Sequence, residues 1–87
     1  MDEIEDSVGA GGMNRSSDVR IVQQLLNQHM LALGLPLLVV DNVAGDITIE
    51  GIREYQRQVV GLARPDGRIE PGGRTWRLLD AGTGVPR

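Results

Sequence analysis

The strongest constraint on the fold is an apolar stripe in the first half of the chain. Large apolar residues recur there at intervals of three and four, at Val19, Val22, Leu26, Met30 and Leu33. This spacing places them on one face of an α-helix. Polar residues suited to a helix start lie at 16–18, and Gly34 and Pro36 favour a stop. The sequence therefore predicts an amphipathic helix over about 18–32.

Two further helices are predicted, each after a cluster of residues that favour turns. Asn, Asp, Gly and Pro all suit tight turns, and they are concentrated in 41–46 and 64–73. The residues Ile49, Ile52, Gln56, Val59 and Val60 then fall on one face at helical spacing, with Tyr55 beside them. This spacing predicts a helix over about 48–60, capped by Asp46 or Thr48 and closed by Gly61. A short last helix is expected from about 75 to 79, and the apolar run 35–40 should be extended.

The two turn clusters resemble each other. Asp41-Asn42, Gly45 and Thr48 precede the second predicted helix, whereas Asp66-Gly67, Gly72 and Thr75 precede the third. In both clusters a glycine lies three residues before a threonine. Any Asx turn that leads into a helix draws on the same residue types, so both a true internal repeat and a coincidence fit the pattern.

The two ends of the chain have a different composition from the middle. Residues 1–16 are rich in acids and glycine, which predicts an N-terminal arm that buries little surface. Residues 81–87 contain two glycines and a proline, which is typical of a tail or linker. One folded domain is therefore expected over 17–80.

Composition excludes several functional classes. The net charge is −3 and the nine basic residues, all arginine, are scattered, which disfavours nucleic-acid binding. No stretch has the roughly 20 apolar residues of a membrane span, and the acidic start is not a Sec signal. Cysteine is absent and His29 is the one histidine, so neither a metal site nor a cofactor is predicted, and His29 is expected to be a packing residue.

Five sequence elements carry a resemblance to a known family. These are Val22-Gln23 with Leu26-Asn27, Asp41-Asn42 with Gly45 and Thr48, Ile52, Tyr55-Gln56, and the segment from Pro65-Asp66-Gly67 to Thr75. Together they resemble the peptidoglycan-binding domain family over about 18–80. The resemblance implies an all-α fold, a small three-helix bundle with long ordered loops. Asn42 stands where that family usually has Gly, Gly51 where it has Ala, and Tyr55 where it has Phe. Tyr55 therefore suggests a hydroxyl that reaches solvent or a ligand.

The resemblance also implies a shallow ligand groove between helices. Candidate ligand-binding residues are Asn42, Asp46, Arg53, Tyr55, Arg57, Arg68, Arg74 and Trp76. Arginine suits stem-peptide carboxylates, and Trp76 either stacks on a sugar or packs in the core. Turn and cap roles are expected for Asp41, Gly45, Thr48, Gln56, Asp66, Gly67 and Thr75. Gln56 should hydrogen-bond the backbone of the 41–48 turn, with ligand contact as the alternative.

A binding role is expected rather than catalysis. Glu50 and Glu54 lie beside Arg53 and Arg57, as on a solvated salt-bridged helix face, unlike the paired acids of a muramidase. An EF-hand loop starting at Asp41 fails because its third and fifth positions are Val43 and Gly45.

The implied function is a non-catalytic peptidoglycan-binding module. Such a module would bind a glycan strand or stem peptide and anchor a cell-wall hydrolase or toxin domain, in the same or another chain. Examples are a phage lysin or an antibacterial effector. It would be made in the cytoplasm and act at the cell envelope after non-Sec delivery. The alternatives are a protein-interaction adaptor on the same scaffold and a catalytic fragment.

Overall fold

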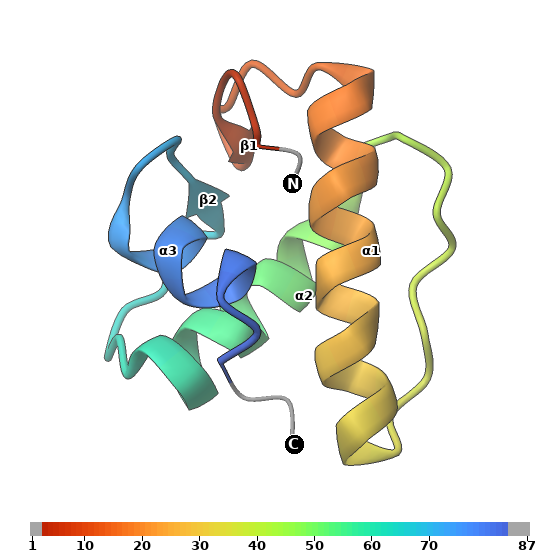
Figure 1. The fold of residues 1–87 in the computed structure, drawn as a ribbon, viewed down its shortest axis with the longest axis vertical. Coiled ribbons are helices and arrows are strands. Elements are labelled where there is room, and N and C mark those ends of the chain that lie inside the picture. The colour runs from red at the N-terminus through yellow and green to blue at the C-terminus, as the bar shows by residue number, and fades with distance from the viewer. Residues whose placement is uncertain (1–2, 84–87) are drawn as a thin grey trace.

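A computed structural model describes residues 3–83 of the chain (Figure 1). Its elements are β1 (Val8–Gly9), α1 (Ser16–Leu33), α2 (Asp46–Tyr55), η1 (Gln56–Val60), β2 (Arg68–Ile69) and α3 (Arg74–Asp80). The three predicted helices are confirmed, and a two-stranded sheet that the sequence analysis did not predict joins them. No helix within 3–83 combines the length and apolar character needed to cross a bilayer.

The predicted apolar stripe forms one side of the core along most of α1. Val19, Val22 and Leu26 are fully buried and Met30 is nearly so. The helix ends as expected at Gly34, whose φ of 71° is left-handed. Leu33 is 47% exposed, contrary to the predicted stripe, because the last turn of α1 extends beyond the elements that pack against it (Figure 1).

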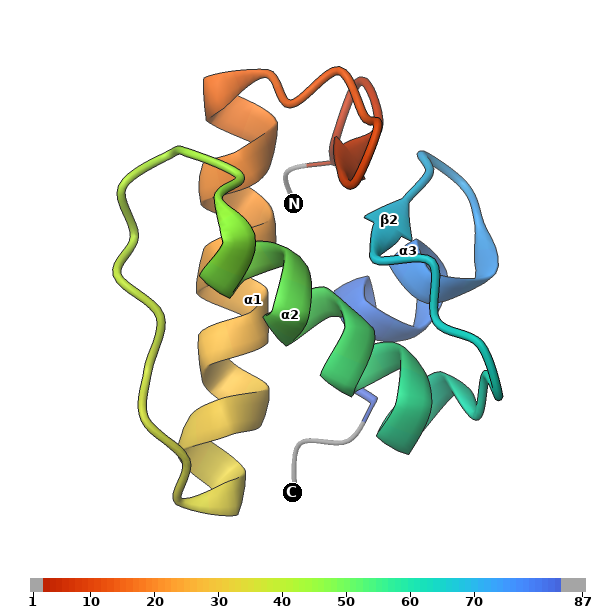
Figure 2. The same cartoon turned by 180° about the vertical axis from the view of Figure 1, so that it is seen from behind.

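The second predicted helix consists of α2 and a continuation, η1, that has π-helical hydrogen bonding. It starts at Asp46 after Gly45, without a side-chain cap, so neither Asp46 nor Thr48 has the expected capping role. Figure 2 shows α2 crossing α1. Gly51 lies at this contact, where an added Cβ would be 3.1 Å from the Met30 methyl group. The absence of a side chain at Gly51 thus allows the two helices to approach closely.

The N-terminal segment is part of the core, so the prediction of an arm that buries little is wrong for its described residues. Ile4 and Val8 are buried, and β1 pairs antiparallel with β2, Val8 opposite Ile69. Asp18, itself buried, accepts hydrogen bonds from the backbone N–H groups of Glu5 and Asp6 at 3.0 Å each. Composition alone does not show which residues are buried: Ile4 and Val8 point inward, whereas Glu3, Glu5 and Met13 are exposed.

The segment between α1 and α2 is extended, as predicted, and runs along α1 (Figures 1 and 2). Leu38 is its one buried large apolar residue. The Asn27 side chain accepts a hydrogen bond from the Leu38 N–H at 2.7 Å and donates one to the Leu38 carbonyl at 2.9 Å. One side-chain amide therefore takes the place of a neighbouring strand and fixes this loop against α1. Of the predicted tail 81–87, residues 84–87 lie outside the described residues, as do residues 1–2 of the predicted arm.

Candidate functional site

The turn over 41–48, here the first turn, is organised around Gln23 of α1. The Gln23 Nε2 donates to Asp41 Oδ1 at 3.0 Å, the Val43 carbonyl at 3.1 Å and Thr48 Oγ1 at 2.9 Å. Its Oε1 accepts from the Asn42 N–H at 3.1 Å. Gln23 is fully buried, so these bonds satisfy an amide that has no access to water.

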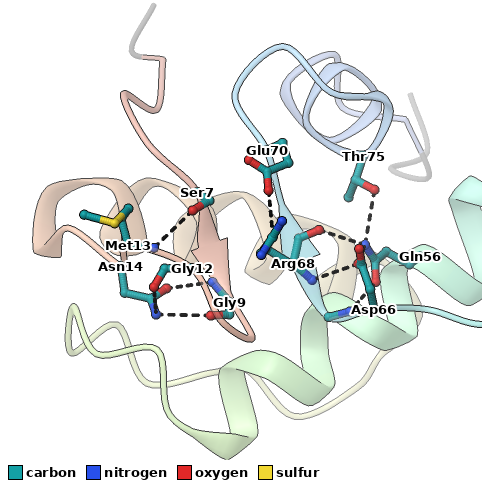
Figure 3. Close-up of polar contacts among 11 residues, drawn as sticks. Ser7, Gly9, Gly12, Met13, Asn14, Gln56, Asp66, Arg68, Glu70 and Thr75 are labelled. Carbon is teal, nitrogen blue, oxygen red and sulfur yellow. Dashed lines mark hydrogen bonds and ion pairs between the residues drawn. The ribbon is translucent and has the colours of Figure 1, made fainter.

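The turn over 66–75, the second turn, is organised in the same way around Gln56 (Figure 3). The Gln56 Nε2 donates to Asp66 Oδ1 at 2.9 Å, the Arg68 carbonyl at 3.1 Å and Thr75 Oγ1 at 3.3 Å. Its Oε1 accepts from the Gly67 N–H at 2.9 Å. Gln56 is a turn-organising residue as predicted, but the prediction that it serves the 41–48 turn is wrong, since Gln23 already occupies the interior of that turn.

The two turns therefore share a bonding scheme and not only a residue pattern. In each, a buried glutamine bonds an aspartate side chain, the N–H of the following residue, the carbonyl of the residue after that, and a threonine hydroxyl. Asn42 has a φ of 67° and Gly67 one of 70°, so both occupy the left-handed region that the predicted turns require. The helix starts differ slightly, because Thr48 is the third residue of α2 whereas Thr75 is the second of α3. This correspondence favours an internal repeat over coincidence.

Hydrogen bonds lower the pKa of the aspartate that begins each turn. The Gln23 amide and the Val43 N–H lower the pKa of Asp41. Burial raises the pKa of Asp66, but the Arg68 N–H and the Gln56 amide outweigh it, and the net pKa is lowered. In both cases the folded state prefers the carboxylate.

These lowered pKa values predict a loss of stability in acid. A group whose pKa falls on folding stabilises the protein above its unfolded pKa, here near 3.8, and that contribution disappears as the pH drops through the lower folded value. We expect the urea midpoint of unfolding to fall between pH 5 and pH 3, and to fall less in Asp66→Asn. An equal slope in Asp66→Asn and wild type would contradict this assignment.

Two candidate ligand-binding residues are enclosed. Tyr55 is fully buried, and its hydroxyl donates to the Thr83 carbonyl at 2.8 Å. Burial raises the pKa of Tyr55 to about 12. The expectation that its hydroxyl meets solvent or ligand is therefore wrong in this conformation. Trp76, 3% exposed, takes the core alternative rather than stacking on a sugar.

The remaining candidates are accessible and lie on several surfaces: Arg68 and Arg74 line one small depression beside the second turn, whereas Asn42 and Asp46 line two others. Arg53 and Arg57 form ion pairs with Glu50 at 2.7 Å and Glu54 at 2.6 Å, as the solvated helix face predicted. Arg68 pairs with Glu70 at 2.6 Å beside the second turn. Arg74, also at the second turn, has no ion pair among the described residues.

A polar depression lies between the start of α1 and the first turn. It has a volume of about 690 Å³, and its lining includes Arg20, Gln24 and Asn42 together with Ser16, Ser17 and the acids Glu3, Glu5 and Asp18. Of these residues, the sequence analysis predicted only Asn42 as ligand-binding. Arg20 and Gln24 were missed although both lie on the polar face of the predicted helix. Their proximity to the first turn depends on how α1 and that turn pack together.

A second depression, the apolar groove, lies between 37–43 and the start of α2. It has a volume of about 560 Å³, and its lining includes Leu37, Val39, Val43, Asp46 and Ile47. Of the predicted ligand residues only Asp46 lines this groove. The sequence feature that could have predicted this groove is the apolar run after Gly34, because a domain of this size has too few elements to cover such a run.

His29 is a buried packing residue, as predicted. The residue is 4% exposed, and its ring meets the Tyr55 ring edge-on, with centroids 5.1 Å apart. Neither ring nitrogen has a hydrogen-bond partner within the described part of the chain. No group of three or more His, Cys, Asp or Glu residues in that part is placed to hold a metal ion.

The comparisons with known proteins add no relative. No family model matches the chain, and neither a curated protein nor a solved structure matches it.

Proposed function

We propose that this chain binds bacterial peptidoglycan without cutting it. One observation carries the proposal: the residues on which the family resemblance rests form hydrogen-bonded units in space. Gln23 lies at least 18 residues before Asp41, Asn42 and Thr48 in the sequence, yet it bonds all three in the first turn. A chance match of residue types gives no reason for those residues to contact one another. The shared scheme supports the family's three-helix fold and, through it, the family's ligand class.

The exposed surface beside the turns has suitable chemistry. The polar depression offers the Arg20 guanidinium, the Gln24 amide and the Asn42 side chain, beside the carboxylates of Glu3, Glu5 and Asp18. Hydroxyls and amides match glycan hydroxyls and peptide groups, while arginine grips a stem carboxylate bidentately. Arg20 and Arg74 have no ion-pair partner within residues 3–83, so a ligand carboxylate would not have to displace an acid from either one.

A binding module of this kind acts by raising the local concentration of substrate around the protein that it anchors. Attached to or bound by a cell-wall hydrolase or toxin domain, it would hold that partner on the polymer and raise the local concentration of its substrate. The anchored protein would supply any bond cleavage.

Co-sedimentation with purified insoluble peptidoglycan tests the proposal. We expect the chain to sediment with the polymer at low salt and the bound fraction to fall at high salt, because arginine contacts are screened. Arg20→Gln should weaken binding about tenfold if one charge-assisted contact is lost. Arg77→Gln, on the exposed side of α3, is the matched control and should bind like wild type.

Asn42→Gly separates ligand contact from turn geometry. Glycine retains the left-handed backbone at 42 and its N–H, so the first turn should persist while the side chain is lost. Weaker sedimentation with an unchanged circular dichroism spectrum would place the ligand at Asn42. Absence of sedimentation of the wild-type chain at low salt would refute peptidoglycan binding.

A protein-interaction adaptor is the second candidate function. The apolar groove favours it, because its exposed apolar residues are unlike a surface that recognises only polar glycan. The two functions use different surfaces and are therefore compatible.

A further inference from the structure

The extended segment and its surroundings expose an unusual amount of apolar surface. The large apolar residues with at least 39% exposure in this region are Leu31, Leu33, Leu35, Leu37, Val39, Val40, Val43 and Ile47. Val39 and Ile47 are 76% and 77% exposed and both line the apolar groove, Val39 from the extended segment and Ile47 from α2. A small domain has no structural need for such a concentration of exposed branched side chains.

One wall of the groove offers a residue of extended backbone, Leu37, that has no backbone hydrogen bond within residues 3–83, whereas the Leu35 N–H and the Val39 carbonyl are already bonded. In an extended chain, the N–H and C=O of consecutive residues point to alternate sides. Leu38 directs both groups to the Asn27 side chain. Those of Leu37 therefore point away from α1, and neither is hydrogen-bonded to any residue in the described range. Leu37 thus offers the donor and acceptor that one residue of an antiparallel partner strand requires.

The charges around the groove have a single sign. Between residues 21 and 52 the chain contains Asp41, Asp46 and Glu50 but no Lys or Arg. Asp46 lines the groove and has no ion-pair partner among residues 3–83. A ligand with a cation at this end would meet an unpaired carboxylate, whereas an acidic ligand would be repelled.

From these observations we infer that the apolar groove binds an extended protein segment that carries alternating branched apolar residues and a Lys or Arg beside Asp46. The segment pairs its backbone with Leu37, and every second side chain enters the space between Val39 and Ile47. This is recognition by strand addition, in which the backbone supplies affinity and the pockets supply specificity. The inference goes beyond peptidoglycan binding and does not depend on it.

Two other occupants fit less well. A second copy of this chain would present its own 35–40 segment, which has no basic residue to pair with Asp46. An anionic lipid surface attracts basic residues beside an apolar face, whereas the residues beside this face are acidic.

Selection from a synthetic random hexapeptide library tests the inference with the full chain. We expect the retained peptides to alternate apolar and polar residues and to carry Lys or Arg at one end. Replacing that basic residue by Gln in a retained peptide should weaken binding at least fivefold in wild type and leave it unchanged in Asp46→Asn. Amide signals of 37–39 and 47 should shift on titration.

Matched variants separate a specific groove from general stickiness. Val39→Asn with Ile47→Asn removes two exposed groove side chains and should abolish peptide binding, while sedimentation with peptidoglycan is unchanged. Leu31→Asn with Leu33→Asn removes two exposed apolar residues outside the groove lining and should leave peptide binding intact. Retained peptides without the alternating basic pattern would overturn the inference. So would equal losses in the two double variants, or concentration-dependent dimerisation that the Val39 and Ile47 changes abolish.

Discussion

Replacing Gln23 or Gln56 by alanine is expected to destabilise the protein by about 3 kcal/mol in each case. The substitution removes four hydrogen bonds and deprives groups of the turn, among them the Thr75 hydroxyl and the Asn42 or Gly67 N–H, of their glutamine partner. Each such orphaned group costs about 1–3 kcal/mol, and the vacated volume adds to the loss. Since small domains have roughly 5–15 kcal/mol in total, the double variant should not fold.

Urea unfolding monitored by circular dichroism measures this effect. Gln24→Ala is the matched control, because Gln24 is the exposed neighbour of Gln23 on α1 and should change stability by less than about 0.5 kcal/mol. A change below about 1 kcal/mol in Gln56→Ala would show that the second turn does not need its central amide. The symmetry of the two turns predicts similar losses for the two single variants.

Deleting residues 1–14 is expected to abolish cooperative unfolding. The deletion removes the buried Ile4 and Val8, uncovers Ile69, and leaves the buried Asp18 carboxylate without its two N–H donors. Truncating a large core side chain to alanine costs about 2–5 kcal/mol, and orphaning a buried carboxylate adds several more. The sum is comparable to the whole stability of a domain of this size.

Single substitutions in the same segment should lower the stability by smaller amounts. Val8→Ala should cost about 2 kcal/mol, whereas Met13→Ala, 68% exposed in the same segment, should be nearly neutral. Thermal unfolding with a sharp transition in the shortened chain would contradict the assignment of this segment to the core and would restore the prediction of a dispensable arm.

Local signals fixed most of the helical structure. The apolar spacing of α1, the left-handed glycines that follow α1 and η1, and the turn residues before α2 and α3 act over a few neighbouring residues. Their physical causes, helix amphipathicity and backbone sterics, are therefore readable from the sequence. The positions of both turns and the exposed ion pairs of α2 were predictable for the same reason.

Partners distant in the sequence were not predictable in this way. Gln56 was assigned to the wrong turn because a buried amide can satisfy itself at either, and only the packing of α2 and α3 brings the second turn to it. The missed signal was Val22-Gln23, which has the same apolar–glutamine order as Tyr55-Gln56 and marks a glutamine beside an apolar stripe. The prediction of an exposed Tyr55 hydroxyl was wrong for the same reason, because the Thr83 carbonyl, 28 residues away in the sequence, accepts its hydrogen bond.

By itself, then, the sequence determined the three helices, their apolar faces and two aspartate-headed turns, since those depend on contacts within a few residues. Only the tertiary structure decided that residues 3–14 belong to the core, which glutamine serves which turn, and that apolar side chains gather in an exposed groove. Those outcomes depend on surfaces from separate parts of the chain meeting in three dimensions. The composition and spacing of a single segment do not show which distant segment it will contact.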